Sequence, residues 1–153
     1  MLDDHDRSIL ELVQRNNQLT HAAIAEAVCL SASAVRRRLR ALRESGVIQS
    51  DVSIVDPDGR VIQIVVLVRF QREGVDRYRD FKERMLASPE VSQCYSVAGD
   101  VDFVLVVNAP DLAAYEAWGE RVLMKDPDIR RYDSLVVYSR AKFTTELPAD
   151  ALV

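Results

Sequence analysis

Residues 19–48 contain two short apolar segments separated by a few residues, and the second segment is rich in arginine. Thr20 and Ser31 stand immediately before the two segments, where a side-chain oxygen can cap the first free amides of a helix. Gly46 follows the second segment, at the position where helices commonly end in a left-handed residue. Two short helices joined by a tight turn are typical of a helix-turn-helix that reads DNA.

A further helix is predicted ahead of this pair, because Asp3 or Asp4 can cap its start and Asn16 can end it. Within the first helix of the pair, the apolar residues at helical spacing are Ala23, Ile24, Ala27 and Val28. After Gly46 the sequence VIQSDVSIV alternates well enough to form a short strand or hairpin, as a wing would. Residues 1–55 are therefore predicted to form a winged helix-turn-helix domain, called the head below.

The arginine-rich helix separates into two faces when its residues are placed about 100° apart around the axis. Val35, Leu39 and Leu42 form an apolar stripe that we expect to face the core. The opposite face carries one serine and four arginines: Ser33, Arg36, Arg37, Arg40 and Arg43. A solvated arginine surface usually includes glutamates at four-residue spacing, and here only Glu44 can pair, with Arg40. The pattern favours DNA binding over a solvated surface.

The roles of these residues follow from how a recognition helix meets DNA. Its first residues approach the base edges, so Ser33, Arg36 and Arg37 are the predicted base readers. The two later arginines of the same face are predicted to clamp phosphates. Arg38 lies beside the apolar stripe, and we expect it either to brace the head or to touch a phosphate from the side. The candidate DNA-binding residues are Ser31, Ser33, Arg36, Arg37, Arg38, Arg40 and Arg43.

Charge is distributed unevenly along the chain. Residues 1–50 hold seven basic and six acidic side chains, and the remaining residues hold 13 of the 20 basic and 18 of the 24 acidic ones. Affinity for DNA depends on local neutralisation of phosphates, so an acidic protein must concentrate its basic groups. Five of the seven basic residues of the first segment lie between positions 36 and 43. The chain is therefore predicted to have a DNA-facing head and a larger acidic body.

The turn sequence at 56–59, DPDG, marks the predicted linker, residues 56–60. Beyond it we predict strand 61–70, helix 75–88, strands 91–97 and 102–107, helix 111–124 and strand 131–142. The side chains predicted to point inward are Tyr78, Phe81, Met85, Leu86, Leu112, Tyr115, Trp118 and Val122. This order is the βαββαβ of ferredoxin-like domains. The fold class is therefore α+β, with the body at 61–143 and a C-terminal tail at 144–153.

Two further patterns lie within the body. Each predicted helix ends in a related tetrapeptide, Ser88-Pro89-Glu90-Val91 or Asp126-Pro127-Asp128-Ile129, which indicates a weak internal repeat. The strand at 61–70 is apolar at both odd and even positions, although helices cover only one face of the sheet in this topology. The simplest cover for the second apolar face is the same sheet of another copy, related by a two-fold axis.

The segment 98–102, AGDVD, has two interpretations. It can be a hairpin turn whose acidic residues serve solubility, or it can be a ligand loop. A glycine turn exposes backbone amides that hold a carboxylate, and an aspartate holds an ammonium group. That combination would suit an amino acid.

Three segments resemble a known family when they are taken in order. They are Leu2-Asp3 with Asp6 and Ile9-Leu10; Leu30-Ser31-x-Ser33-x-Val35-x-Arg37-Arg38 with Leu42 and Gly46-Val47-Ile48; and Ser96-Val97-Ala98-Gly99-Asp100-Val101-Asp102-Phe103-Val104-Leu105. Together they resemble the Lrp/AsnC (feast/famine) transcription regulators of bacteria and archaea, over nearly the whole chain. Two residues depart from the family pattern: Cys29 stands where a glycine is usual, and Ala98 stands where a threonine is common.

The resemblance implies a homodimer, often assembled into octamers, whose C-terminal domains bind amino acids at interfaces between dimers. It places ligand contacts on Ala98, Gly99, Asp100, Val101, Asp102, Ser134 and Val136. Ligand binding would shift the assembly or the geometry of the heads. Such a shift requires that the ligand bind the two arrangements of the protein with different affinities. Cys29 in place of glycine implies a strained or altered turn between the two helices.

The expected function is therefore a sequence-specific transcription regulator that binds double-stranded DNA and senses an amino acid or a related metabolite. The alternative is an architectural DNA-binding protein whose body only oligomerises. An enzyme is disfavoured because the sequence offers no nucleophile–base pair or phosphate loop, and no cofactor is expected.

Cellular location and metal content follow from composition. No apolar run approaches the ~20 residues that span a membrane, and the start MLDDHDR does not resemble a secretory signal. With two cysteines, a reducing cytoplasm is expected, in association with the nucleoid. The cysteines and histidines lack the spacing of zinc ligands.

Overall fold

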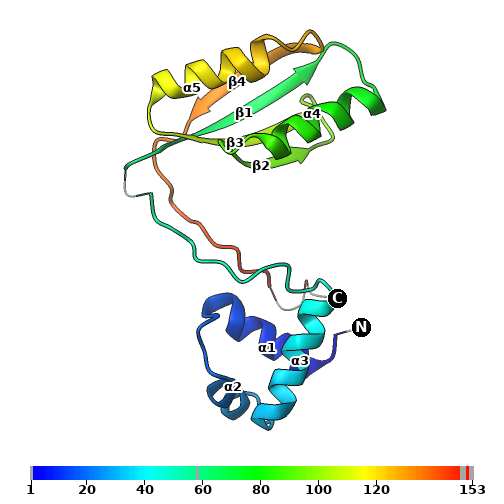
Figure 1. Cartoon of the computed structure of the whole chain (residues 1–153), viewed down its shortest axis with the longest axis vertical. Helices are drawn as coiled ribbons and strands as arrows, with labels where there is room; N and C mark the ends of the chain where they lie inside the picture. Colours follow the sequence, from blue (N-terminus) through cyan, green and yellow to red (C-terminus); the bar gives the residue numbers. More distant parts are fainter. Residues whose placement is uncertain (1, 58, 149–150, 152–153) are drawn as a thin grey trace. The chain divides into compact units, whose positions relative to one another are not determined.

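The computed structural model describes residues 2–57, 59–148 and 151, and it divides the chain into two compact units (Figure 1). One unit contains the residues up to Val55 together with those from Lys142 onward, and the other is Asp56–Ala141. The division after Val55 coincides with the predicted end of the head. The two units are described separately below.

The head contains three helices: α1 Asp4–Arg15, α2 His21–Ala27 and α3 Ala32–Glu44. Each begins at a predicted cap, because Asp3, Thr20 and Ser31 each accept a hydrogen bond from the backbone amide three residues later, at 2.8, 3.1 and 3.2 Å. Gly46 has the predicted left-handed conformation, with φ at 77°. These caps are confirmed.

The core of the head is formed where the three helices meet. Its buried members are Ile9, Leu10, Ile24, Ala25, Val28, Val35, Leu39 and Leu42. The apolar stripe predicted for α3 is therefore confirmed. In α2 the prediction is partly wrong, because Ala25 is buried while Ala23 and Ala27 are exposed. Alanine is small enough to be tolerated on either side of a helix, so periodicity alone did not distinguish these three positions.

The predicted wing strand is wrong for the isolated chain. Residues 49–57 contain no strand, and Val52, Ile54 and Val55 are 66%, 58% and 79% exposed. A strand needs a neighbour whose backbone groups complete its hydrogen bonds, and the head has no strand among its described residues.

The C-terminal tail lies against the head. The residues from Lys142 onward belong to the same compact unit as the head. The side-chain amide of Gln14 exchanges two hydrogen bonds with the backbone of Leu147, at 2.7 and 3.2 Å, and Arg15 pairs with Glu146 at 2.7 Å. These polar contacts fasten the tail to α1.

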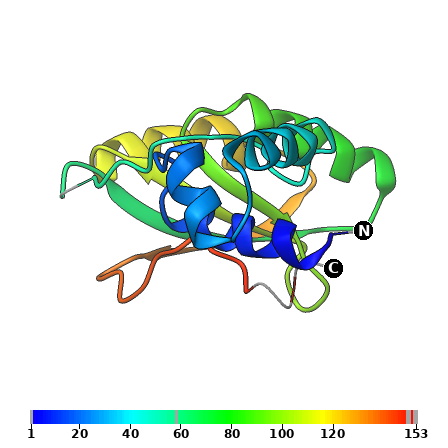
Figure 2. The ribbon, with the colours of Figure 1, turned by 90° about the horizontal axis from the view of Figure 1, so that it is seen from below.

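The body confirms the βαββαβ order. Its elements are β1 Ile62–Phe70, α4 Val75–Ala87, β2 Val91–Ser96, β3 Phe103–Ala109, α5 Leu112–Gly119, the π-helix η1 Glu120–Met124, and β4 Ile129–Val136. The sheet is antiparallel in the order β2-β3-β1-β4, and α4 and α5 cover one of its faces (Figures 1 and 2). β4 ends before the predicted residue 142, because Val136 already pairs with Ile64, close to the start of β1.

The core of the body lies between the sheet and its two helices. Phe81, Met85 and Trp118 are buried as predicted, but Leu86 and Leu112 face solvent at 87% and 59% exposure. At the end of the second helix, Leu123 is buried, and Val122, the residue predicted to point inward, is only partly buried. The cause is η1, since its wider turn advances the inward position by one residue relative to an α-helix.

Candidate DNA-binding face and ligand loop

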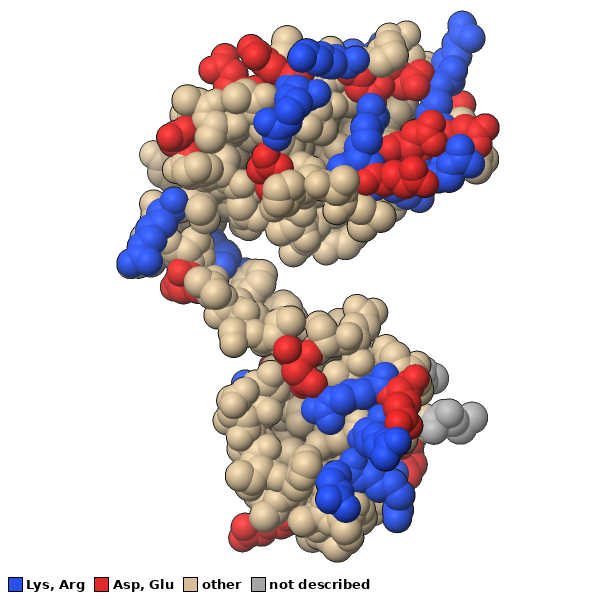
Figure 3. Space-filling view, in the orientation of Figure 1, with Lys and Arg blue, Asp and Glu red and all other residues tan. Residues whose placement is uncertain are grey.

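The outward face of α3 begins with two arginines that have free guanidinium groups. Arg36 and Arg37 are exposed, and neither forms an ion pair or side-chain hydrogen bond with the residues that the structure describes. Ser33 is exposed beside them, and its hydroxyl lies 3.0 Å from that of the capping Ser31. Basic side chains gather over this part of the head (Figure 3). The predicted base readers are therefore available to an incoming duplex.

The two later arginines of this face are held by acidic neighbours. Arg40 pairs with Glu44 at 2.7 Å, the one pairing that the sequence predicts, and Arg43 pairs with Asp51 at 2.9 Å. All four side chains are substantially exposed, and ion pairs of this kind contribute about 0–1 kcal/mol. A phosphate can therefore replace either carboxylate at small cost.

Arg38 differs from the other arginines of α3. Its Nη1 lies 2.7 Å from both Asp3 Oδ2 and Asp6 Oδ1 at the start of α1. The backbone amide of Asp6 and then the Arg38 guanidinium lower the pKa of Asp3. The contacts correspond to the bracing role, one of the two that the sequence left open. Arg38 Nε, in contrast, is buried with no hydrogen-bond partner among the described residues, which reduces the net stabilisation.

Replacing Arg38 with alanine is expected to lower the midpoint of thermal unfolding by roughly 5 °C, because α1 and α3 lose their ionic contact. Circular dichroism on heating measures this change. Arg36→Ala, on the same helix but without a partner, is the matched control and should leave the midpoint in place. Equal midpoints for both variants would show that the brace contributes nothing.

The turn between α2 and α3 contains Cys29 with φ at 54°, the one non-glycine residue with positive φ in the described part of the chain. A side chain in this left-handed region costs roughly 1–2 kcal/mol relative to glycine, because its Cβ crowds the following carbonyl. The strain that the family resemblance implied for this turn is therefore present in the backbone. The thiol itself is exposed and free.

The candidate ligand loop joins β2 to β3. Ala98, Gly99 and Asp100 are exposed, and Gly99 has φ at 148°, a conformation that side chains strongly disfavour. No atom lies within 4 Å of the place where a Cβ would stand at Gly99. The glycine is thus required by the backbone conformation and not by lack of space.

Asp102, also predicted to contact a ligand, is turned into the fold. Its Oδ2 accepts a hydrogen bond from the amide of Phe70 at 2.7 Å, and its Oδ1 accepts one from the hydroxyl of Tyr78. This hydrogen bond, together with burial, raises the pKa of Tyr78 to about 12. Both carboxylate oxygens are occupied, so Asp102 holds the loop against β1 and α4, while Asp100 is the carboxylate that faces outward.

The chain does not bring the other two predicted ligand residues to this loop. Val136 pairs with Ile64, whereas Phe103 at the end of the loop pairs with Val68, four residues further along β1. Because β1 also separates β4 from β3, these positions are more than ~10 Å apart. Ser134 is exposed on the edge strand β4, on the face of the sheet that carries the helices, and its hydroxyl is bonded to that of Tyr115.

The uncovered face of the sheet is apolar at its centre. Partners across the strands place one set of partly exposed apolar residues on this face: Val65, Leu67, Tyr95, Val104, Val106 and Leu135. Tyr95 and Leu135 are 53% and 52% exposed. Arg69 and Asp133 form an ion pair at 2.6 Å on the same face. An apolar centre beside a charged pair is typical of a protein interface.

Two classes of site are not found in the described residues. No group of three or more histidine, cysteine or acidic side chains is placed to hold a metal ion. Among the described helices, none combines the length and apolarity required for a membrane span.

Comparison with known families assigns both parts of the chain. Residues 2–49 match a winged helix-turn-helix DNA-binding model, and residues 63–147 match the Lrp/AsnC ligand binding domain. An uncharacterised HTH-type transcriptional regulator of Sinorhizobium fredii is 40% identical over 97% of this chain and 89% of its own length. The DNA-binding transcriptional activator DecR of Escherichia coli is 30% identical over 98% of this chain and 100% of its own.

Solved structures agree over the full length. A crystal structure of an AsnC family transcriptional regulator from Agrobacterium tumefaciens has a TM-score of 0.90 and 34% identity, covering 99% of this chain and 100% of that one. The complex of a Neisseria meningitidis transcriptional regulator with L-methionine also has a TM-score of 0.90, with 28% identity over 100% of both chains.

Proposed function

The chain belongs to the Lrp/AsnC family of DNA-binding transcriptional regulators, and on this basis we propose that α3 reads an operator while the body senses an amino acid. The family consists of regulators and not of enzymes. The observation that carries the DNA assignment is the pair of exposed guanidinium groups of Arg36 and Arg37 at the start of α3, for which the described part of the chain supplies no partner. Such groups make bidentate contacts with guanine in the major groove. With DNA as its partner, the protein is proposed to act in the cytoplasm, on the nucleoid.

We propose that two copies associate through the open faces of their sheets. A continuous apolar surface at the centre of this face supports the proposal, since exposed patches of this kind are usually interaction sites. A two-fold dimer would place two heads on one duplex, which compensates for the weak charge of a single head. Assembly of dimers into an octamer is the further expectation.

The effector is proposed to be an amino acid held at the loop of residues 98–102. Exposed amides around Gly99 suit its carboxylate, and Asp100 suits its ammonium group. Ser134 and Val136 are distant within one chain, so they would complete the site from a neighbouring copy. L-methionine is the first probe, because the related Neisseria regulator binds it.

Replacing Gly99 with valine is expected to weaken binding of the effector by at least about tenfold, because valine cannot adopt φ at 148° and the loop must move. Calorimetric titration of the full-length protein with the twenty amino acids identifies the effector and measures the loss. DNA binding in gel shifts should not change. Gly74→Val is the matched control, since Gly74 is extended, with φ at 178°.

Two outcomes would contradict these assignments. Normal binding by the Gly99 variant would place the ligand site elsewhere. Absence of binding by any of the twenty amino acids would favour an architectural DNA-binding protein whose body only oligomerises.

A further inference from the structure

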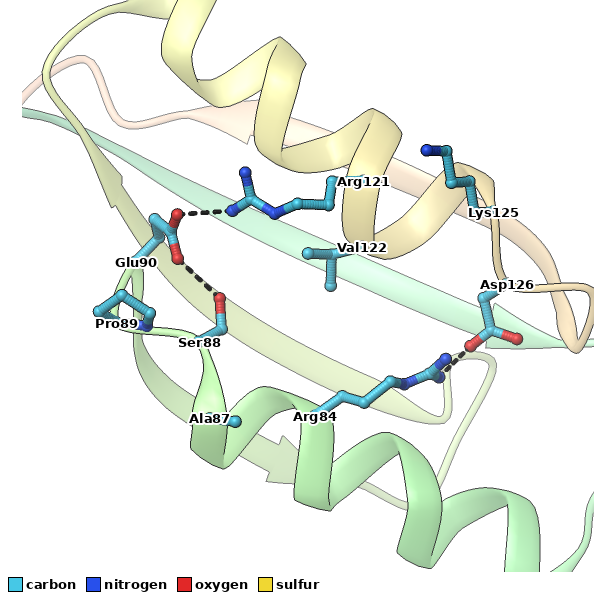
Figure 4. A pocket seen from close by; sticks show the side chains of 9 residues that line it. All are labelled: Arg84, Ala87, Ser88, Pro89, Glu90, Arg121, Val122, Lys125 and Asp126. Atoms are coloured by element: carbon cyan, nitrogen blue, oxygen red, sulfur yellow. Dashed lines mark hydrogen bonds and ion pairs between the residues drawn. The ribbon is translucent and has the colours of Figure 1, made fainter.

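A pocket lies on the helical side of the body, between the end of α4 and η1 (Figure 4). Its volume is about 490 Å³, within the ~300–1,000 Å³ range of small-molecule sites. Arg84 enters from α4, whereas Arg121 and Lys125 come from η1 and the residue that follows it. Three cations therefore surround a space that is separate from the ligand loop.

The acidic groups of this pocket already have partners. Glu90 accepts from Arg121 Nη2 at 2.7 Å and from Ser88 Oγ at 2.8 Å, one bond on each carboxylate oxygen. Asp126 accepts from Arg84 on Oδ2 and from the backbone amide of Asp128 on Oδ1, the latter at 2.9 Å. All four carboxylate oxygens are thus occupied within the chain.

Hydrogen-bond donors, in contrast, are left over. Each guanidinium has five N–H groups, and one nitrogen of each is used in the ion pairs described above. Lys125 has three further donors and no ion pair with any described residue. The Arg84 and Arg121 side chains are 46% and 58% exposed. Three cations and two carboxylates give the pocket a formal charge of +1. The hydrogen-bonding groups that are still available in it are N–H donors.

A ligand for this pocket must therefore be an anion rich in hydrogen-bond acceptors. The planar fork of an arginine matches a carboxylate, with which it forms two parallel hydrogen bonds. Cations on two opposite walls suit a molecule with an acid group at each end, and Val122 and Pro89 add apolar surface to the lining. We propose that the pocket binds a small dicarboxylate, independently of the proposed amino-acid site.

Two structural features connect this pocket to the rest of the body. Ser88 Oγ accepts a hydrogen bond from Trp118 Nε1 at 2.8 Å, so the buried indole is one bond away from the pocket wall. The wall that carries Arg121 is the π-helix η1, and π-turns in helices are frequent at functional sites. The two repeated tetrapeptides, Ser88–Val91 and Asp126–Ile129, supply the acidic residues on either side. Trp118 Nε1 is thus placed to report on occupancy of the pocket.

Trp118 is the one tryptophan of the chain, so the full-length protein labelled with ¹⁵N has a single indole resonance. Titration with succinate is expected to shift this resonance saturably, and the neutral analogue succinamide should not. Inorganic phosphate is run as the alternative anion. A shift with phosphate but not with succinate would overturn the dicarboxylate assignment, as would no shift with either.

Variants test the residues of the pocket. Lys125→Gln and Arg121→Gln should each weaken succinate binding by about tenfold, because each removes charge-assisted hydrogen bonds. Glu90→Gln keeps an acceptor for Arg121 but removes a negative charge, so it should tighten binding. Lys142→Gln removes the same charge as Lys125→Gln outside the pocket and should have no effect. Equal weakening by the two lysine variants would indicate non-specific attraction and would contradict the proposal.

The proposal of an amino-acid site and the proposal of this dicarboxylate site can be tested independently. The Gly99→Val variant should lose its response to the amino acid and retain the shift with succinate. Loss of both responses in that variant would show that the two ligands share one site.

Discussion

Replacing Arg36 and Arg37 together with alanine is expected to lower affinity for the operator by about 30-fold to 20,000-fold. The range follows from about 1–3 kcal/mol of discrimination for each bidentate contact with a base. Both guanidinium groups are exposed at the start of α3 and have no partner in the described chain. Their N–H donors are therefore available for hydrogen bonds to DNA. Gel shifts with a fragment of the protein's own promoter region measure the loss.

The matched control is the double replacement of Arg72 and Arg130 with alanine, which removes the same charge from the body. It should leave the gel shift unchanged. Arg43→Ala provides a second contrast. Loss of a phosphate contact should weaken binding to all DNA sequences alike and reduce the slope of log affinity against log salt concentration by about one. Unchanged retention of the promoter fragment by the Arg36/Arg37 variant would refute the assignment of the reading face.

Replacing Leu135 with aspartate is expected to prevent formation of the proposed dimer. Leu135 lies on the open face of the sheet, opposite Val65, and is 52% exposed in the isolated chain. A second copy would bury the new carboxylate among apolar side chains and beside Asp133, and an unpaired buried charge costs several kcal/mol. Light scattering coupled to size-exclusion chromatography should report the mass of a single chain for the variant and a larger mass for the wild-type protein, and DNA affinity should fall with the loss of assembly.

Leu86→Asp is the control for this experiment. Leu86 is 87% exposed on the outer side of α4, away from the sheet, so the same substitution there should preserve the mass. If both variants keep the wild-type mass, the open face is not the interface. If both dissociate, the helical side takes part as well.

Much of the head was predictable from short sequence separations. The three helix caps depend on residues three positions apart, and the apolar stripe of α3 depends on Val35, Leu39 and Leu42 at helical spacing. The separation of Arg38 from the outward arginines followed from the same geometry. Its partners, Asp3 and Asp6, were not predictable, because they belong to a different helix whose packing angle is not encoded locally.

The body shows the same distinction. Its element order could be predicted because alternation and helical periodicity are local signals. The burial of Leu123 in place of Val122 could not be predicted, since it depends on the π-helix η1 at the end of α5. The inward turn of Asp102 was missed for a similar reason: its partners, Phe70 and Tyr78, come from β1 and α4.

The sequence by itself determined the order of helices and strands in the body, the capped ends of the head helices, the apolar stripe of α3, and where the basic charge is concentrated. These properties depend on neighbours within a few positions, so they are present in any copy of the segment. The tertiary structure decided which charged groups remain free. Among the described residues Arg36 and Arg37 have no partner while Arg38 is paired, and Asp100 faces outward while Asp102 is occupied. The physical reason is that a partner can be supplied only by a distant segment, once packing has brought it within hydrogen-bonding distance.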